Sequence, residues 1–328
     1  MAEFNPNITV GETSWLVEGL IPNGHLCIFL AQAGVGKSLW AESLAVHVSS
    51  GVDFCHLKTI SSDVLIIDQD TPTKVLQKRL SKFFRGITNI QETPGQNKNK
   101  LFFESMNGYN FSDGTIFTLI KDHPTAKLVI IDSLFSVCGK LNPNSISDLN
   151  QALVKLKNEC LSEDKVIIIN HHISEKMPDA SLEFLMTENP HVFSMGASSV
   201  IQQADTYYVI GASAENGTTS RIYLRPIAKR APVNSTPKIF RLIQPEQESE
   251  RMEFDGEWDG VNLANEERDV LMYFKANPQD TKSVLDVYKD TGHMHGETAI
   301  RKALQSLEKK GLLVLLKQRG NLFKYKLP

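Results

Sequence analysis

The chain has 328 residues, of which 41% are hydrophobic and 22% charged, and its formal net charge is −3. This composition is typical of a globular protein with one large domain and a small second one. No apolar run approaches the roughly 20 residues of a membrane span, and the first residues lack the basic-then-apolar order of a signal peptide. We therefore expect a cytoplasmic protein without membrane contact. Its four cysteines form no CxxC pair, which favours reduced, buried thiols.

Charge is distributed unevenly along the chain. Residues 265–328 hold 12 Lys/Arg and 8 Asp/Glu, whereas the preceding stretch, 244–264, holds seven acidic residues and one Arg. An acidic, polar stretch between two patterned regions predicts a linker. The sequence thus predicts a first domain over 1–243, an acidic linker over 244–264 and a small basic domain over 265–328.

In the first domain, five short apolar runs rich in β-branched residues predict strands that are buried on both faces, as in a parallel sheet. Helical patterns such as 74–84 and 147–161 separate most of them, which predicts an α/β fold with a mostly parallel sheet and helices on both faces. Later runs at 206–210, 221–226 and 238–242 are typical of antiparallel strands added to such a sheet. The five predicted parallel strands are Leu26–Leu30, Val64–Ile67, Leu101–Phe103, Leu128–Ile131 and Val166–Ile169.

The small domain shows helical patterns over 266–276, 282–290 and 297–310, followed by a predicted hairpin over 312–327. Gly311 is expected to end the last helix as a C-cap. Three helices followed by a β-hairpin is the element order of a winged-helix domain.

The strongest functional signal is AQAGVGKS, residues 31–38, which fits G-x-x-x-x-G-K-[ST] except that Ala31 replaces the first Gly. A predicted strand precedes it and a helix follows, as a phosphate-binding loop requires. Backbone N–H groups at the helix N-terminus would bind phosphate oxygens, Lys37 would reach the β- and γ-phosphates of ATP, and Ser38 would hold Mg²⁺. The predicted nucleotide-binding residues are Ala33, Gly34, Val35, Gly36, Lys37, Ser38 and Leu39.

Two further strand ends supply carboxylates. Asp132 ends the strand in LVIIDS and is expected to bind Mg²⁺ together with Ser38. Hydrolysis also needs a carboxylate that orients or deprotonates water, and VLIIDQD ends a strand close behind the P-loop helix. We predict that Asp70 has this catalytic role and Asp68 is the alternative; Asp70 could instead cap the next helix.

VIIINHH, residues 166–172, ends another strand with polar side chains, one of which could sense the γ-phosphate. Neighbouring residues of a strand point to opposite faces, so His171 and His172 cannot easily bind one metal ion together. A structural histidine remains an alternative to a sensor.

Together these motifs resemble those of RecA-like P-loop ATPases, in particular the plasmid RepA-type hexameric replicative helicases, over about residues 10–245. WLVEGLIPNGHLCIFLAQAGVGKS is similar to that family's first strand and Walker A motif, VLIIDQDTPTKVLQKRL to its acidic segment, LVIIDSL to its Walker B motif and IINHHISEK to its sensor strand. A gap-free match of the sensor strand favours His171 as the catalytic sensor. The resemblance implies a homo-oligomeric ring, a hexamer, with ATP and Mg²⁺ at subunit interfaces and single-stranded DNA in the pore.

The chain departs from this family at two places. The family usually has Glu where this chain has Asp70, and it commonly has Arg just before a small-residue segment, where this chain has SMG at 194–196. In the family, basic residues of a later hairpin, similar to IAKRAPVNSTPKIFRL here, reach a neighbour's nucleotide. We therefore expect Lys229 and Arg230 to form a catalytic finger, meaning a basic side chain inserted into the neighbour's ATP site. A solvated hairpin tip is the alternative.

The loops expected to line the pore, 133–147 and 171–194, offer only Lys140 and Lys176 as Lys or Arg residues. The predicted winged helix is more basic. Its helix over 298–310 would enter the major groove of duplex DNA, with the wing near phosphates, although a winged helix can also serve protein contacts. The predicted DNA-binding residues are Arg301, Lys302, Lys317 and Arg319.

Two functions fit the sequence. The first is an ATP-hydrolysing, ring-forming DNA motor, a replicative helicase of a plasmid, phage or mobile element. The second is an ATP-switched DNA-binding regulator or loader that hydrolyses slowly and does not unwind DNA. The full set of ATP motifs favours the motor, whereas the weak pore charge and Asp70 favour the switch.

Overall fold

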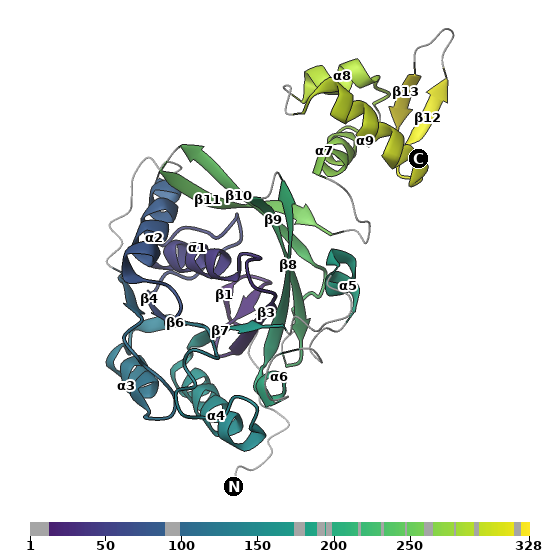
Figure 1. Ribbon diagram of the computed structural model, residues 1–328. Coiled ribbons are helices and arrows are strands. Elements are labelled where there is room, and N and C mark those ends of the chain that lie inside the picture. Colours follow the sequence, from purple (N-terminus) through teal and green to yellow (C-terminus); the bar gives the residue numbers. More distant parts are fainter. Residues whose placement is uncertain are drawn as a thin grey trace, which may run out of the picture. The chain divides into compact units, whose positions relative to one another are not determined.

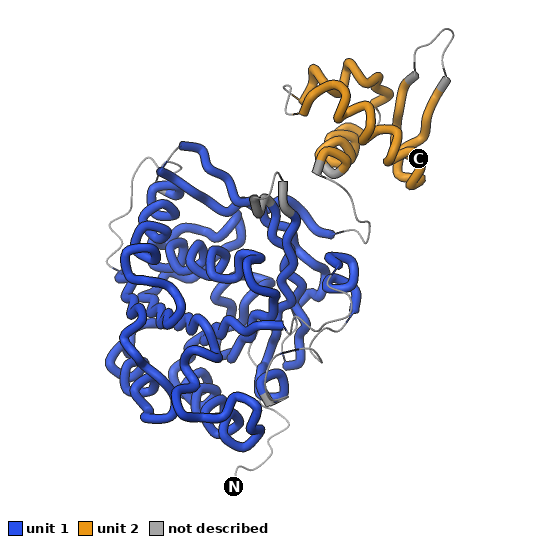
Figure 2. Tube along the Cα trace, in the orientation of Figure 1, with its two compact units in different colours: residues 1–260 blue, residues 261–328 orange. Residues whose placement is uncertain are grey.

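The computed structural model describes residues 13–88, 99–173, 181–188, 194, 199–215, 218–230, 233–246, 248–258, 265–278, 280–291, 295–317 and 323–328. The chain forms two compact units, residues 1–260 and 261–328 (Figure 2). All four cysteines are free and buried, as predicted. Among the described residues, no helix is long and apolar enough to cross a membrane.

The first unit is built on a sheet that has nine strands in the described part of the chain (Figure 1). These strands are β3 (Leu26–Ala31), β4 (Asp63–Asp68), β5 (Leu101–Ser105), β6 (Ala126–Asp132), β7 (Val166–His172), β8 (Thr206–Glu215), β9 (Thr218–Ala228), β10 (Lys238–Glu246) and β11 (Ser249–Glu257). Their order is β11-β10-β9-β8-β3-β7-β6-β4-β5. Strands β8 to β5 of this order are parallel, and β9, β10 and β11 extend the sheet as antiparallel strands. Two short strands, β1 (Trp15–Val17) and β2 (Ile21–Pro22), pair separately.

Helices cover both faces of this sheet. Side chains alternate between the faces along each strand, and apolar side chains on both faces have to be buried. On β7, Ile167 and Ile169 pack with α3 (Thr115–Asp122) and α4 (Ile146–Glu163). Val166 and Ile168 point the other way and join the core that contains α1 (Lys37–Ser50) and α2 (Thr73–Thr88). The helices α5 (Leu182–Thr187) and α6 (Ser199–Gln203) are short. The predicted α/β fold, a mostly parallel sheet with helices on both faces, is confirmed.

Helix α1 is buried on almost every side. Its residues from Trp40 to Val48 are buried without a gap. The antiparallel end of the sheet curls over the helix, since the Trp40 ring lies 5.6 Å from that of Phe240 on β10, and Met252 of β11 belongs to the same core. Strand β11 also packs on α2. The P-loop helix is therefore enclosed by the parallel strands, by α2 and by the β10–β11 hairpin.

The predicted acidic linker over 244–264 is wrong over most of its length. Residues 244–246 complete β10, and residues 249–257 form β11, so the first unit extends well beyond residue 243. A run of carboxylates predicted a solvated segment, but cations of α2 and of neighbouring strands pair with them and make the segment an edge strand. The pairs include Glu250–Lys82 at 2.7 Å, Asp255–Arg241 at 3.0 Å and Glu257–Lys238 at 3.2 Å. Residues 259–264 lie outside the described residues.

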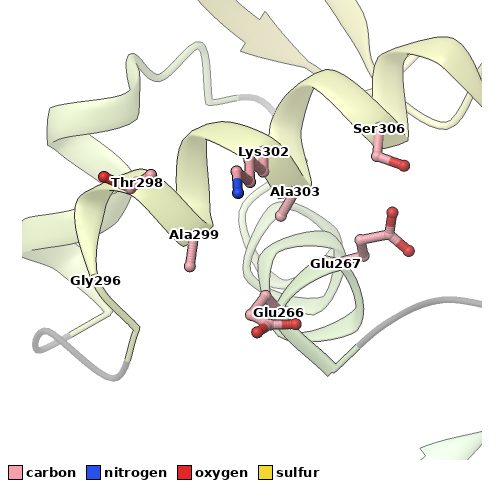
Figure 3. A pocket seen from close by; sticks show the side chains of 8 residues that line it. All are labelled: Glu266, Glu267, Gly296, Thr298, Ala299, Lys302, Ala303 and Ser306. Carbon is pink, nitrogen blue, oxygen red and sulfur yellow. The ribbon is translucent and has the colours of Figure 1, made fainter.

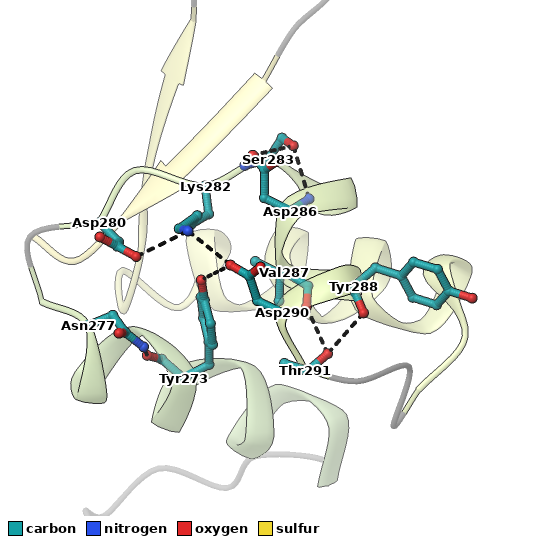
Figure 4. Close-up of polar contacts among 10 residues, drawn as sticks. All are labelled: Tyr273, Asn277, Asp280, Lys282, Ser283, Asp286, Val287, Tyr288, Asp290 and Thr291. Carbon is teal, nitrogen blue, oxygen red and sulfur yellow. Dashed lines mark hydrogen bonds and ion pairs between the residues drawn. The ribbon is translucent and has the colours of Figure 1, made fainter.

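The second unit has its own apolar core. Its described elements are the helices α7 (Asn265–Ala276), α8 (Val284–Asp290) and α9 (Glu297–Lys309) and the antiparallel strands β12 (Val314–Lys317) and β13 (Phe323–Lys326). Polar contacts fix the start of α8 and tie it to α7 (Figure 4). Ser283 and Asp286 form a capping box, and Asp290 accepts a hydrogen bond from the Tyr273 hydroxyl at 2.6 Å and pairs with Lys282 at 2.9 Å. The predicted order of helices followed by a hairpin is confirmed, and Gly311 follows α9 with a φ of 72°.

Gly86 of α2 lies against the backbone of β11, where an added Cβ would lie 1.9 Å from the carbonyl oxygen of Glu250. Replacing a helical Gly by Ala usually stabilises a protein by about 1 kcal/mol. Here the methyl group would force α2 and β11 apart, so we expect Gly86→Ala to lower the free energy of unfolding by about 1–3 kcal/mol. Denaturant unfolding measures this, with Gly296→Ser as a control, since a Cβ at Gly296 meets nothing within 4 Å. A stabilised Gly86→Ala variant would contradict the packing described here.

Candidate nucleotide-binding site

The loop between β3 and α1 has the backbone shape of a phosphate cradle. Gly34 has a φ of 77° and Gly36 a φ of 94°, a left-handed conformation that side chains disfavour. A Cβ on Gly34 would meet nothing within 4 Å, so the backbone conformation rather than space requires glycine there. The turn places the N-terminus of α1, with its unpaired N–H groups, at the carboxyl edge of the parallel strands.

Lys37, the first residue of α1, points back into this loop. Its Nζ lies 3.0 Å from the carbonyl oxygen of Gln32, 3.4 Å from that of Ala31 and 3.5 Å from Nδ1 of His172. Burial lowers the pKa of Lys37, although the carboxylates of Asp132 and Asp70 oppose this effect. A partly desolvated ammonium group with neutral acceptors would gain from an anionic one, such as a phosphate.

Ser38 and Asp132 meet as predicted. The Ser38 hydroxyl donates a hydrogen bond to Oδ2 of Asp132 at 2.5 Å. Burial raises the pKa of Asp132, and the hydrogen bond from Ser38 and the nearby Asn170 amide lower it in part. A hydroxyl and a carboxylate oxygen side by side are the hard donors that Mg²⁺ prefers. The two residues therefore fit the predicted magnesium site.

The two acidic candidates at the end of β4 are held differently. Oδ1 of Asp68 accepts the backbone N–H groups of Asp70 and Thr71, both at 2.8 Å, and its side chain is buried. Asp70 is exposed, and its charge acts on Lys37 and His172. Asp68 thus shapes a turn, and the turn presents Asp70 to the phosphate site. This geometry favours Asp70 over Asp68 as the carboxylate that handles water.

The structure places His172, and not His171, beside the P-loop. His171 is fully buried and stacks on Phe135, with ring centroids 5.8 Å apart and an interplanar angle of 7°. The gap-free motif match selected His171, but alternation along β7 turns it to the face opposite α1. Burial and the nearby Lys37 lower the pKa of His172, and Asp70 opposes this shift; in the neutral ring, Nδ1 can accept a hydrogen bond from Lys37.

Asn170 is a site residue that the sequence interpretation missed. It pairs with Asp132 across β7 and β6 and is completely buried. Its amide lies near enough to Asp132 to affect that carboxyl, yet within the described residues neither side-chain amide atom has a hydrogen-bond partner of good geometry. Buried amides without well-formed hydrogen bonds are rare, and this one lies beside Asp132, where Mg²⁺ is expected. An Asn between an apolar run and two histidines was too weak a signal.

Glu42 was missed as well. It lies one turn beyond Ser38 on α1, is 3% exposed and pairs with Arg79 of α2 at 2.8 Å. Burial raises the pKa of Glu42 to about 8; Arg79 opposes this shift, while Asp132 and Asp68 add to it. The only signal in the sequence was a charged residue inside a helix that is otherwise suited to burial.

Lys229 and Arg230 are held by their own chain. Lys229 Nζ donates to the carbonyl oxygens of Ile201 at 2.7 Å and Gln202 at 3.1 Å. Arg230 donates to Oδ1 of Asp205 at 2.9 Å and is half-exposed. Both follow β9 where it pairs with the start of β8, at the sheet edge opposite the P-loop. They therefore cannot act on their own chain's phosphate site, and the finger in a neighbour's site remains a prediction.

The DNA-binding candidates lie in the second unit. Arg301 is exposed but pairs with Glu297 at 2.9 Å. Lys302 is exposed and borders a pocket of about 540 Å³ between α9 and α7, beside Glu266 and Glu267 (Figure 3). Lys317 ends β12, and Arg319 lies outside the described residues. Of the described cations, Arg301, Lys302 and Lys309 share the exposed face of α9.

The profile of a known protein family matches residues 9–176, just over half of the chain, under the description AAA domain. The chain belongs to the AAA domain family. The matched AAA domain contains Lys37, Ser38, Asp70 and Asp132, which identifies the site above as that of a P-loop ATPase domain. Strands β8 to β11 and the second unit lie outside the match.

No curated protein matches this chain. The solved structures that match include a KaiC-like protein from the hyperthermophilic archaeon Pyrococcus horikoshii OT3. It is 15% identical, with a TM-score of 0.46, and the match covers 72% of this AAA domain protein and 93% of that chain.

The raised pKa of Glu42 predicts how stability depends on pH. Between its ordinary value of 4.5 and about 8, the unfolded chain loses the Glu42 proton while the folded chain keeps it, so the free energy of unfolding falls as pH rises. Glu42→Gln cannot ionise and keeps an acceptor for Arg79. Its stability relative to the wild type should therefore increase from pH 5 to pH 8 and level off above. Denaturant unfolding at pH 5, 7 and 9 tests this; a difference independent of pH would refute it.

Proposed function

We propose that this AAA domain protein hydrolyses ATP with Mg²⁺ and that the turnover drives a ring-forming DNA motor of the replicative helicase type. The observation that carries the ATPase part is the 2.5 Å contact between Ser38 and Asp132, next to a P-loop whose Lys37 points into the phosphate cradle.

Each residue has a separate task in this proposal. The N–H groups at the start of α1 and the Lys37 ammonium group bind the β- and γ-phosphates. Ser38 and Asp132 hold Mg²⁺, which supplies positive charge where the phosphoryl group becomes more negative. Asp70 orients the attacking water and accepts its proton. His172 stays neutral and accepts a hydrogen bond from Lys37, which keeps the ammonium group at the carboxyl edge of the sheet.

Three observations support the DNA motor. The motifs resemble those of RepA-type helicases, which use such sites at the interfaces of a hexameric ring. Arg230 is half-exposed at the edge opposite its own P-loop, where a head-to-tail neighbour would bring its nucleotide. The second unit has the element order of a winged helix and exposes Lys302 and Lys309 on α9.

One observation favours the ATP-switched regulator or loader instead. Both finger candidates contact groups of their own chain. Lys229 donates to carbonyl oxygens of α6, and Arg230 pairs with Asp205. Without a finger, charge on the γ-phosphoryl group lacks a neutralising partner worth about 10³–10⁵ in rate. ATP turnover with and without single-stranded DNA separates the two functions. Strong stimulation supports the motor, and slow turnover with ATP-dependent duplex binding supports the switch.

Lys37→Ala should abolish ATP binding, because it removes the only cation of the described P-loop. Asp70→Asn should keep ATP binding and lower turnover by about two to four orders of magnitude, since the amide cannot accept the proton of water. Steady-state turnover and titration with a fluorescent ATP analogue measure the two effects. Wild-type turnover in Lys37→Ala would refute the site, and unchanged turnover in Asp70→Asn would transfer the water-handling role to another group.

Lys302→Ala and Lys309→Ala should each weaken duplex binding by the full chain if α9 contacts DNA. Each phosphate contact that is lost should flatten the slope of log affinity against log salt concentration by about 0.9. Lys289→Ala is the matched control, because it removes a cation from α8 instead. Salt-dependent fluorescence anisotropy gives the slopes. Equal slopes for all four proteins would favour a second unit that contacts protein.

A further inference from the structure

We propose that Arg79 of α2 is a positioning residue for hydrolysis, which joins the P-loop helix to the turn that carries Asp70. This inference rests on the proposed function, in which Asp70 orients the attacking water. Contacts between α1, α2 and the end of β4 support it.

A single guanidinium nitrogen makes the connection. Nη2 of Arg79 lies 2.8 Å from Oε1 of Glu42 on α1 and 3.0 Å from the hydroxyl oxygen of Thr71, to which it donates. The same nitrogen lies 4.0 Å from Oδ2 of Asp68. Glu42 follows Ser38 by one helical turn. Arg79 therefore connects the turn at 68–71 to the helix whose N-terminus forms part of the phosphate cradle.

The other contacts of this turn lead to the sheet. Ser105 of β5 donates to the carbonyl oxygen of Thr71 at 2.5 Å, and the N–H group of Met106 donates to that of Asp68 at 2.9 Å. Asp68 also accepts two hydrogen bonds from backbone N–H groups of the turn. All these hydrogen bonds fix the shape of the turn and its position on the strands. Among the described residues, the Arg79 side chain links this turn to α1 by direct contacts with Glu42 and Thr71.

The short side chain of Asp70 makes the position of its backbone decisive. An aspartate carboxylate has one methylene less reach than a glutamate, so a shift of the turn is passed on to the carboxylate almost undiminished. A water-activating group must come within hydrogen-bond distance of its water, and a misplacement of about 1 Å can lower the rate about 100-fold.

Stability alone does not account for this pair. The Glu42 side chain is 4% exposed and that of Arg79 25%, so within the described part of the chain a desolvated carboxyl group has one ion-pair partner. Apolar side chains of similar size commonly serve a fold as well as such a pair does, or better. A role in holding the turn at a set distance from the P-loop explains why polar groups occupy the space between α1 and α2.

The test uses two mild variants of the full chain. Thr71→Val removes the hydroxyl acceptor at constant shape, and Arg79→Lys keeps the charge but ends one bond short of Nη2, the nitrogen that contacts both Glu42 and Thr71. Each should lower kcat about 10–100-fold while the Kd for ATP changes less than about threefold. Lys82→Gln is the matched control, because it removes a second ion pair of α2, that with Glu250 at 2.7 Å, and should leave kcat within about twofold.

Combination with Asp70→Asn decides whether Arg79 acts through Asp70. If it does, adding Arg79→Lys or Thr71→Val to Asp70→Asn should cause no further loss of turnover. Multiplicative losses would show a general effect on the fold and overturn the inference, as would normal kcat in both single variants. Slow turnover in Asp70→Asn with normal turnover in the Arg79 and Thr71 variants would refute this inference alone. A wild type without turnover would refute the proposed function and this inference with it.

Discussion

The phosphate site depends on the burial of α1. A P-loop binds phosphate only if the N-terminus of its helix has a fixed position. Here the sheet, α2 and the β10–β11 hairpin pack against the helix. The Trp40 ring of this helix meets the rings of Phe54, which closely follows it, and of the distant Phe240. Because the helix axis is fixed, the glycines with positive φ have only to turn the chain from β3 into α1. This turn brings Ser38 to Asp132.

The same burial sets the electrostatics. Desolvation lowers the pKa of Lys37 and raises the pKa values of Asp132 and Glu42, so charge on these groups is costly, and Glu42 keeps its proton up to about pH 8. Bound phosphate would compensate the lysine, and a divalent cation would compensate the carboxylate. Ligand binding would thus offset part of the desolvation cost of Lys37 and Asp132. Arg79 offsets part of the same cost at Glu42.

The sequence predicted those parts of the site that depend on local rules. Gly34, Gly36 and Lys37 follow from the loop motif, and Asp132 follows from a buried strand that ends in a carboxylate. The errors concern tertiary contacts. Side chains alternate along β7, so only one of His171 and His172 can lie on the face of α1. A motif match of one strand does not show which face of the strand packs against α1. The acids of 249–257 were assigned to a linker because their partners, such as Lys82, lie far away in the sequence.

Asn170 and Glu42 were missed for a related reason. Their importance lies in being buried beside other polar groups, which only the folded chain reveals. The second unit was predicted more fully, because its helices and hairpin are defined by patterns within a few residues. Local caps such as Ser283 with Asp286 set its boundaries.

The curl of β10 and β11 over α1 has a consequence for synthesis on the ribosome. Helix α1 is translated early, while the strands β10 and β11 that cover it are translated near the end of the first unit. At roughly 5–20 residues per second, the stretch from Ser50 to Glu257 takes about 10–40 s to make. Throughout this interval Trp40 lacks the Phe240 and Met252 side chains that share its core in the folded unit.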